Sequence, residues 1–212
     1  MFYLKYVIFN RFSLKILLEA SDVVASGGLI VFPTDTVYGL GGDPFNLRTI
    51  RRVFEVKHRA SRPLPILVSD LNVAYTLGVF NDYAVTLSEK FWPGPLTLIV
   101  PSKAVVPEEL TLGLSSVGLR MPNHNIALNL IDYCGGSLIG TSANISGGRA
   151  PKTASDALSQ LGLDVDYFLD AGPCPIGFSS TVVDVSISPP KFVREGSIKK
   201  EEIEDILGIE LS

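Results

Sequence analysis

Residues 27–42, GGLIVFPTDTVYGLGG, contain a short apolar strand that leads directly into polar side chains and glycines. The segment LIVF (29–32) is wholly apolar, which is typical of a strand buried on both faces of a sheet. A helix with helical spacing of leucine and valine is predicted over 13–26, and Gly27-Gly28 ends it. The stretch therefore predicts a helix followed by a buried strand, with a polar loop at the strand's carboxyl end.

The rest of the chain repeats this alternation of short apolar strands and helices of about ten residues. Strands are predicted at 1–9, 29–32, 65–68, 96–100, 117–120, 137–141, 167–170, 180–185 and 191–194, and helices at 13–26, from about 46 onward, 84–91, 126–133, 153–161 and 199–207. This order is typical of an α/β protein with a mostly parallel or mixed central sheet. Ligands bind such sheets beyond the carboxyl ends of the strands.

Length and composition limit the possible classes of protein. The 212 residues fit one domain, 1–212. With 46% apolar and 19% charged residues, intrinsic disorder is excluded. The longest apolar runs are too short for a transmembrane helix, and no signal peptide is predicted. The two cysteines and two histidines form no zinc pattern, and unpaired thiols are typical of the reducing cytoplasm.

A dense group of cations interrupts a chain whose net charge is −4. Six of the 18 lysines and arginines lie between 48 and 62: Arg48, Arg51, Arg52, Lys57, Arg59 and Arg62. This density predicts a nearby anion, either phosphate or nucleic acid. The alternative is a solvated helix end, because cations are favoured at a helix C-terminus in any case.

Three more polar segments follow predicted strands. GTSANISGG (140–148) supplies Ser142 and Asn144, which can bind a phosphate or a base. Its pattern is not the GxSxG of a serine nucleophile, so nucleophilic catalysis is not favoured. Arg120 and Arg194 each end a strand, and a cation in that position suits a carboxylate or phosphate. A P-loop and a dinucleotide-binding glycine motif are both absent from the sequence.

Together these segments resemble the YrdC-like family, the threonylcarbamoyl-AMP synthases. The matching stretches occur in the family's order and span about 27–198: GGLIVFPTDTVYGLGGD, KHRASRPLPILVSD, FWPGPLTLIV, VGLRMPNH, GTSANISGG, SSTVVDV and VREGSI. The combination of PTDTVYGL, a KxR and an SxN is highly specific to this family.

The resemblance implies a reaction in which L-threonine, bicarbonate and ATP give threonylcarbamoyl-AMP and pyrophosphate, with Mg²⁺ bridging the phosphates. A separate tRNA threonylcarbamoyl transferase complex would consume the product. The implied fold is α/β, with a twisted open sheet, flanked by helices, whose concave face holds the site. Some relatives carry a second domain after a long linker, and this chain resembles the single-domain form.

The resemblance also implies roles for individual residues, and it assigns no metal ligand to a protein side chain. Catalytic roles fall to Lys57, Arg59, Ser142 and Asn144; ATP contacts to Arg59, Arg62, Ser116, Ser142, Asn144 and Arg194; and threonine contacts to Thr34, Arg120 and Ser180 or Thr181.

Two other functions stay open at the level of sequence. In the first, an RNA-binding module uses the cations of 48–62 to grip a phosphate backbone, and weak RNA binding is also compatible with the enzyme. In the second, the chain is an accessory domain for carbamoyl transfer. The sequence lacks the RNP-type aromatic residues that are typical of an RNA-binding module. It also lacks the zinc-finger-like segments that accompany the carbamoyl-transfer domain.

Overall fold

The computed structural model describes residues 4–8, 13–58 and 62–212. The elements in chain order are β1 (Lys5–Ile8), α1 (Leu14–Ala25), β2 (Ile30–Phe32), β3 (Gly39–Gly41), α2 (Leu47–Val56), β4 (Ile66–Val68), α3 (Leu71–Leu77), α4 (Asp82–Phe91), β5 (Leu96–Pro101), α5 (Glu108–Thr111), β6 (Ser116–Arg120), α6 (Asn125–Tyr133), β7 (Ser137–Ile139), β8 (Thr141–Ser142), α7 (Ala154–Leu161), the 3₁₀ turn η1 (Gly162–Asp164), β9 (Tyr167–Asp170), β10 (Thr181–Asp184), β11 (Lys191–Arg194) and α8 (Lys200–Leu207). The mixed α/β class predicted from the sequence is confirmed.

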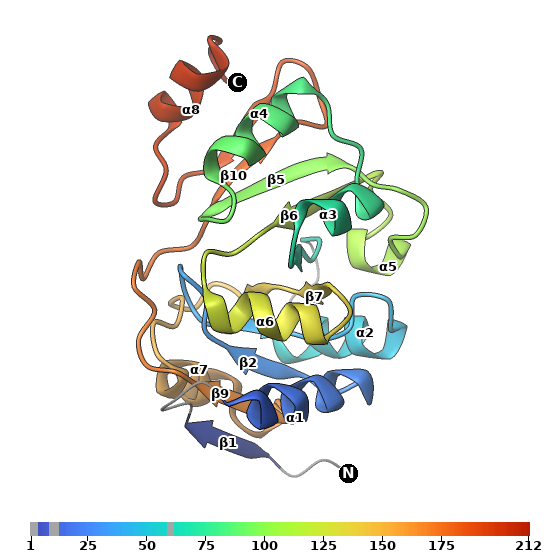
Figure 1. Ribbon diagram of the computed structural model, residues 1–212, viewed down its shortest axis with the longest axis vertical. Coiled ribbons are helices and arrows are strands. Elements are labelled where there is room, and N and C mark those ends of the chain that lie inside the picture. The colour runs from blue at the N-terminus through green and yellow to red at the C-terminus, as the bar shows by residue number, and fades with distance from the viewer. Residues whose placement is uncertain (1–3, 9–12, 59–61) are drawn as a thin grey trace.

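The strands form two mixed sheets, where the sequence suggests one central sheet (Figure 1). One sheet has the order β1-β9-β2-β3-β8 and the other β11-β10-β5-β6-β4-β7. Four neighbouring pairs are parallel, namely β1 with β9, β2 with β9, β5 with β10 and β4 with β6, and the remaining pairs are antiparallel. The carboxyl ends of β2 and β6 therefore belong to different sheets.

The division into two sheets arises at Gly140. The sequence predicts one strand over 137–141, but β7 pairs in the six-stranded sheet and β8 in the five-stranded sheet. A Cβ atom at Gly140 would collide with the side chain of Leu67. The neighbouring Ile139 N–H donates to the Gly42 carbonyl at 2.9 Å, which joins the two sheets. Glycine at 140 thus lets the chain pass from one sheet to the other.

The strand β3 is one of the elements that the sequence pattern does not predict, as are the helices α3 and α5. Glycine disfavours strands in general, because it has no side chain to pack. Here the ring of Phe32 occupies the space beside β3, and a Cβ at Gly39 would lie 3.1 Å from its Cζ atom. The glycines of the 39–42 segment therefore admit a neighbouring aromatic ring, in addition to allowing close backbone approach.

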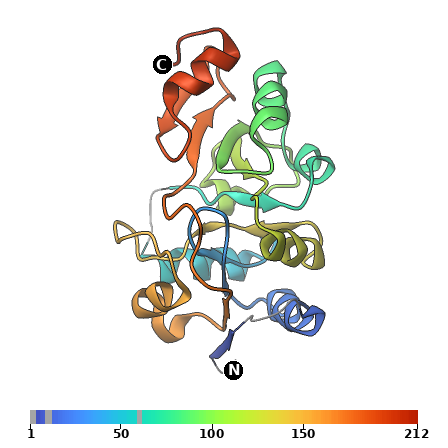
Figure 2. The same ribbon diagram turned by 60° about the vertical axis from the view of Figure 1, so that its left-hand side comes forward.

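Helices cover both faces of the sheets. Figure 2 shows α1, α6 and α4 along one side and α7 on the opposite side. The helix expected near Asn46 begins as predicted, because the Asn46 side chain accepts hydrogen bonds from the N–H groups of Arg48 and Thr49 at 3.0 and 3.3 Å. No helix in the described part of the chain is long and apolar enough to span a bilayer.

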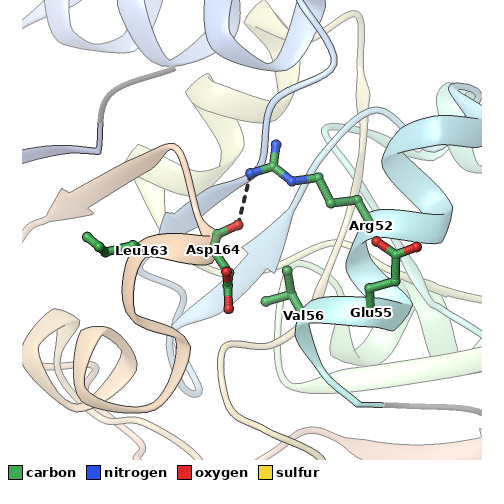
Figure 3. Close-up of a pocket in the computed structure, with 5 residues that line it drawn as sticks. All are labelled: Arg52, Glu55, Val56, Leu163 and Asp164. Carbon is green, nitrogen blue, oxygen red and sulfur yellow. Dashed lines mark hydrogen bonds between the residues drawn. The ribbon is translucent and has the colours of Figure 1, made fainter. Parts of the chain in front are cut away.

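A partly buried ion pair joins α2 to the five-stranded sheet. Arg52 donates to both oxygens of Asp166, at 2.5 and 3.0 Å, and Asp166 also accepts from the Leu29 N–H at 2.7 Å. Arg52 further donates to the Asp164 carbonyl at 2.9 Å, at the edge of a pocket of about 290 Å³ (Figure 3). One of the six clustered cations is therefore a structural residue.

We expect Asp166→Ala to lower the free energy of unfolding by about 1.5–3 kcal/mol, because charged hydrogen bonds to Arg52 and to the start of β2 are lost. Urea denaturation with an unchanged slope would measure this. Asp164→Ala is the matched control, since only the backbone carbonyl of Asp164 meets Arg52. Equal midpoints for the two variants would contradict the structural role of the pair.

Candidate active site

Polar residues from both sheets meet around Arg120, the last residue of β6. The Arg120 side chain is 5% exposed. Its Nε–H donates to the Gly94 carbonyl at 3.0 Å, one terminal nitrogen donates to the Thr36 hydroxyl at 2.9 Å, and the other is paired with Asp35. Burial lowers the pKa of the Arg120 guanidinium, and the charge of Asp35 opposes that shift. The ion pair joins the loop after β2 to the end of β6.

Hydrogen bonds fix the loop after β2, both within the loop itself and to the segment 176–177. The Thr34 hydroxyl donates to the Val37 carbonyl at 2.7 Å and accepts from the Thr36 N–H at 3.1 Å, which is a side-chain turn of the ST type. The carbonyls of Asp35 and Thr36 accept from the N–H groups of Ile176 and Gly177, at 3.1 and 2.7 Å. The Thr34 hydroxyl is thus occupied within its own turn.

Lys57 is buried at the C-terminus of α2, although a lysine at a helix end is usually solvated. Its side chain is 2% exposed, and its ammonium donates to the carbonyl of Ser142 and, at 2.7 Å, to that of Asn144. The Ser146 N–H donates back to the Lys57 carbonyl at 2.9 Å. The solvated-end interpretation is therefore wrong for Lys57, which shapes the loop after β8.

The loop after β8 presents one amide and one hydroxyl. The Asn144 Nδ2 group donates to the carbonyls of Ile145 and Gly148, at 2.9 and 2.8 Å, while its Oδ1 atom is buried and accepts no bond from the described residues. Ser142 is half-buried and makes no side-chain hydrogen bond within the described part of the chain. Both side chains are oriented by the backbone that Lys57 fixes.

Ser180 and Thr181 differ in how many hydrogen bonds their hydroxyl groups make. Thr181 Oγ1 donates to the Ile198 carbonyl at 2.7 Å and accepts from two backbone N–H groups, so its bonding capacity is full. Ser180 Oγ lies 2.8 Å from the Thr97 hydroxyl and 3.2 Å from an Arg194 nitrogen. Arg194 also donates twice to the Ser180 carbonyl, at 3.1 and 2.9 Å.

Positive charge from three separate segments converges here. Desolvation and the nearby charge of Arg62 both lower the pKa of Arg194, and Arg194 in turn lowers that of Arg120. Mutual repulsion among cations in one place is relieved by an anionic ligand. The arrangement thus fits a ligand that carries several negative charges.

Besides these charged groups, the site contains acid–base groups that burial keeps neutral. Burial raises the pKa of the Cys174 thiol to about 11. Desolvation lowers the pKa of His124, with the Asp35 charge opposing the shift. No three His, Cys, Asp or Glu side chains are grouped to hold a metal among the described residues. The site therefore offers cations, amides and hydroxyls, with a neutral thiol.

The structure places Thr34 and Arg120 in one hydrogen-bonded group, joined through Thr36, and Lys57, Ser142 and Asn144 in a second. Ser180, the adjacent Thr181 and Arg194 form a third group, and the charge of Arg62 acts on Arg194 and that of Arg194 on Arg120. Arg59 lies outside the described residues. Ser116 begins β6 and lies roughly 13 Å along the strand from Arg120, at about 3.3 Å per residue. The sequence pattern singled out the polar loop that contains Asp35 and Thr36 but assigned a role in it to Thr34 alone, and it missed Thr97. A charged residue directly after a buried strand, as Asp35 is, was the available signal.

The comparisons with known proteins agree with one another. A family model for Sua5/YciO/YrdC proteins, described as "Telomere recombination", matches residues 22–196. The threonylcarbamoyl-AMP synthase of Pyrococcus abyssi is 39% identical over 191 residues, which cover 89% of this chain and 56% of the relative. That of Bacillus subtilis is 37% identical over 193 residues, covering 90% and 56%. The chain thus spans little more than half the length of these relatives.

Solved structures share the fold. P. abyssi Sua5 complexed with L-threonine superposes with a TM-score of 0.93 at 36% identity, over 99% of this chain and 62% of that one. Escherichia coli YciO superposes with a TM-score of 0.86 at 24% identity, over 96% and 100%, and supports the fold alone. Given the family match over 22–196 and the identity to these relatives, the chain belongs to the Sua5/YciO/YrdC family.

Proposed function

We propose that this protein is a threonylcarbamoyl-AMP synthase, which converts L-threonine, bicarbonate and ATP into threonylcarbamoyl-AMP, pyrophosphate and water. The observation that carries the proposal is the buried Arg120 at the junction of two sheets, where the charge of Arg194 acts on it. The curated relatives are named for this activity, and a relative that superposes with a TM-score of 0.93 was solved in complex with L-threonine.

The reaction needs cations more than it needs a nucleophile from the protein. The carbamate of threonine is an anion, it attacks an anionic α-phosphate, and pyrophosphate leaves with further charge. Positioning and electrostatic stabilisation dominate such displacements. Arg194 and Arg62 would bind phosphates, Ser142 and Asn144 would bind the nucleotide, and Arg120 would bind the carboxylate of threonine. This division of roles uses the charges that the site already concentrates.

The threonine hydroxyl is best matched by Ser180. Thr34 and Thr181 have their hydroxyls engaged within their own loops, whereas among the described residues the Ser180 hydroxyl bonds to the Thr97 hydroxyl and one Arg194 nitrogen alone. Of the hydroxyls expected to contact threonine, Ser180 therefore requires the least rearrangement.

The wider setting is part of the same proposal. Mg²⁺ would enter with ATP, held mainly by phosphate oxygens and water, as is usual for this ion at nucleotide sites. The product would pass to a separate tRNA threonylcarbamoyl transferase complex, in the cytoplasm. The RNA-binding alternative is weakened by the use of Arg52 and Lys57 inside the protein, which reduces the cationic surface left for a phosphate backbone.

The purified protein with Mg²⁺, ATP, bicarbonate and L-threonine should release pyrophosphate without tRNA. Serine should be a somewhat poorer substrate, because one methyl is worth only about 1–3 kcal/mol, whereas 2-aminobutyrate should be much poorer because it leaves polar groups of the site unpaired. A coupled pyrophosphate assay measures all three. Equal release without threonine would show that threonine is not the acceptor.

Arg120→Lys should weaken threonine binding about 10- to 150-fold, the equivalent of one charged hydrogen bond of about 1.5–3 kcal/mol. Lysine keeps a charge opposite Asp35 but loses the bidentate fork. ATP affinity should change less than about twofold by the same reasoning, since the fork serves the amino acid. Isothermal titration with each ligand, with exposed Arg48→Lys as the control, tests the assignment. Loss of ATP binding with threonine binding retained would reverse it.

Lys57→Met should loosen the loop 142–148, because methionine keeps much of the stem but donates no hydrogen bond to the carbonyls of Ser142 and Asn144. Losing a charged hydrogen bond worth about 1.5 kcal/mol corresponds to roughly tenfold faster exchange of the backbone amides in this loop. Hydrogen exchange by mass spectrometry, with exposed Lys90→Met as the control, measures the difference. Unchanged exchange together with a normal turnover would argue that Lys57 has no role in the site.

A further inference from the structure

The carboxylate of Asp35 has one oxygen that receives no hydrogen bond from the part of the chain that the structure describes. Asp35 is 4% exposed, and its Oδ1 atom is paired with Arg120. Its Oδ2 atom is buried and accepts no hydrogen bond from the described residues. An unpaired buried acceptor is costly, and more so when it belongs to a charged group. A buried carboxylate oxygen of this kind is suited to a donor that arrives with a ligand.

The groups around Asp35 do not supply that donor. Arg120 faces it but already donates to Asp35 through Oδ1, to Thr36 and to Gly94. The charge of Asp35 also acts on Cys174 and on His124, which desolvation holds in their neutral forms. Among the described residues no group donates to Oδ2, and a positively charged hydrogen-bond donor on a ligand would match it.

Arg120 also has N–H groups that the described residues do not use. A guanidinium has five N–H groups, and the described residues accept from three of those on Arg120. The remaining two belong to a guanidinium that is hydrogen-bonded to Asp35 itself, so the donors and the Oδ2 acceptor are parts of one ion pair. A single carbon separates the ammonium and carboxylate of an α-amino acid. An adjacent donor and acceptor pair of this kind complements that zwitterion.

We propose that Asp35 binds the α-ammonium of threonine through Oδ2 while Arg120 binds the α-carboxylate, so that the ion pair selects free α-amino acids. This inference rests on the proposed function and adds a residue to it. It gives Asp35 a direct contact with the substrate's reacting nitrogen. That ammonium must lose one proton before its lone pair can attack bicarbonate, and carbamate formation then releases water. The rival role is that Asp35 only orients Arg120.

The two roles predict different responses to a ligand that lacks the ammonium. The probe is 3-hydroxybutanoate with threonine's configuration at its hydroxyl carbon, which keeps the carboxylate, hydroxyl and methyl. If Asp35 contacts the ammonium, wild-type protein should bind threonine at least tenfold more tightly than this probe. Asp35→Asn should then weaken threonine binding tenfold or more and weaken probe binding less than threefold. If Asp35 only orients Arg120, both affinities should fall by the same factor.

Isothermal titration of wild-type protein, Asp35→Asn and the control Asp132→Asn, an exposed aspartate, gives these affinities. Equal losses for threonine and the probe would overturn the inference. If Asp35→Asn does not fold, the wild-type ratio decides alone, and equal affinities for the two ligands overturn the inference. Wild-type protein that neither binds threonine nor releases pyrophosphate would overturn the proposed function as well, an outcome visible without any variant.

Discussion

The buried ion pair between Asp35 and Arg120 holds the two sheets together at the point where the candidate site lies. Asp35 follows β2 of one sheet, and Arg120 ends β6 of the other. Buried pairs often add little net stability, because both charges lose their hydration. What this pair adds is a fixed geometry, since the guanidinium also bonds Gly94 and Thr36. The site therefore forms only when the two sheets are packed against each other in this arrangement.

Lys57 extends the same principle to the loop after β8. A buried ammonium must be hydrogen-bonded, and here the carbonyls of Ser142 and Asn144 accept from it. Charged groups thus serve two purposes here, since Lys57 fixes the backbone of the loop while the charge of Arg62 acts on Arg194. This separation explains why a cation-rich segment does not amount to a simple basic surface.

The sequence predicted much of the fold, because local patterns carry most of the information about single elements. Buried strands such as 29–32 were apparent from their apolar runs, and the Asn46 cap marked the start of α2. The division at Gly140 was not apparent, because it depends on Leu67, a residue more than 70 positions away that occupies the space where a Cβ would lie. The strand β3 was missed for a similar reason, since Phe32 fills the space that its glycines leave.

For the site, the sequence by itself determined which residue types are present and which family they resemble: the polar loop after a buried strand, the clustered cations and the SAN segment. Only the tertiary structure decided their duties. Arg52 forms an ion pair with Asp166, and Lys57 donates hydrogen bonds to backbone carbonyls. The Thr181 hydroxyl makes all the hydrogen bonds it can, whereas the Ser180 hydroxyl does not. Asp35 emerged as a site residue only there, with one oxygen paired and one left open. Charge and hydrogen-bonding capacity are local properties, but their partners come from distant segments, so only the folded chain shows which groups remain for a ligand.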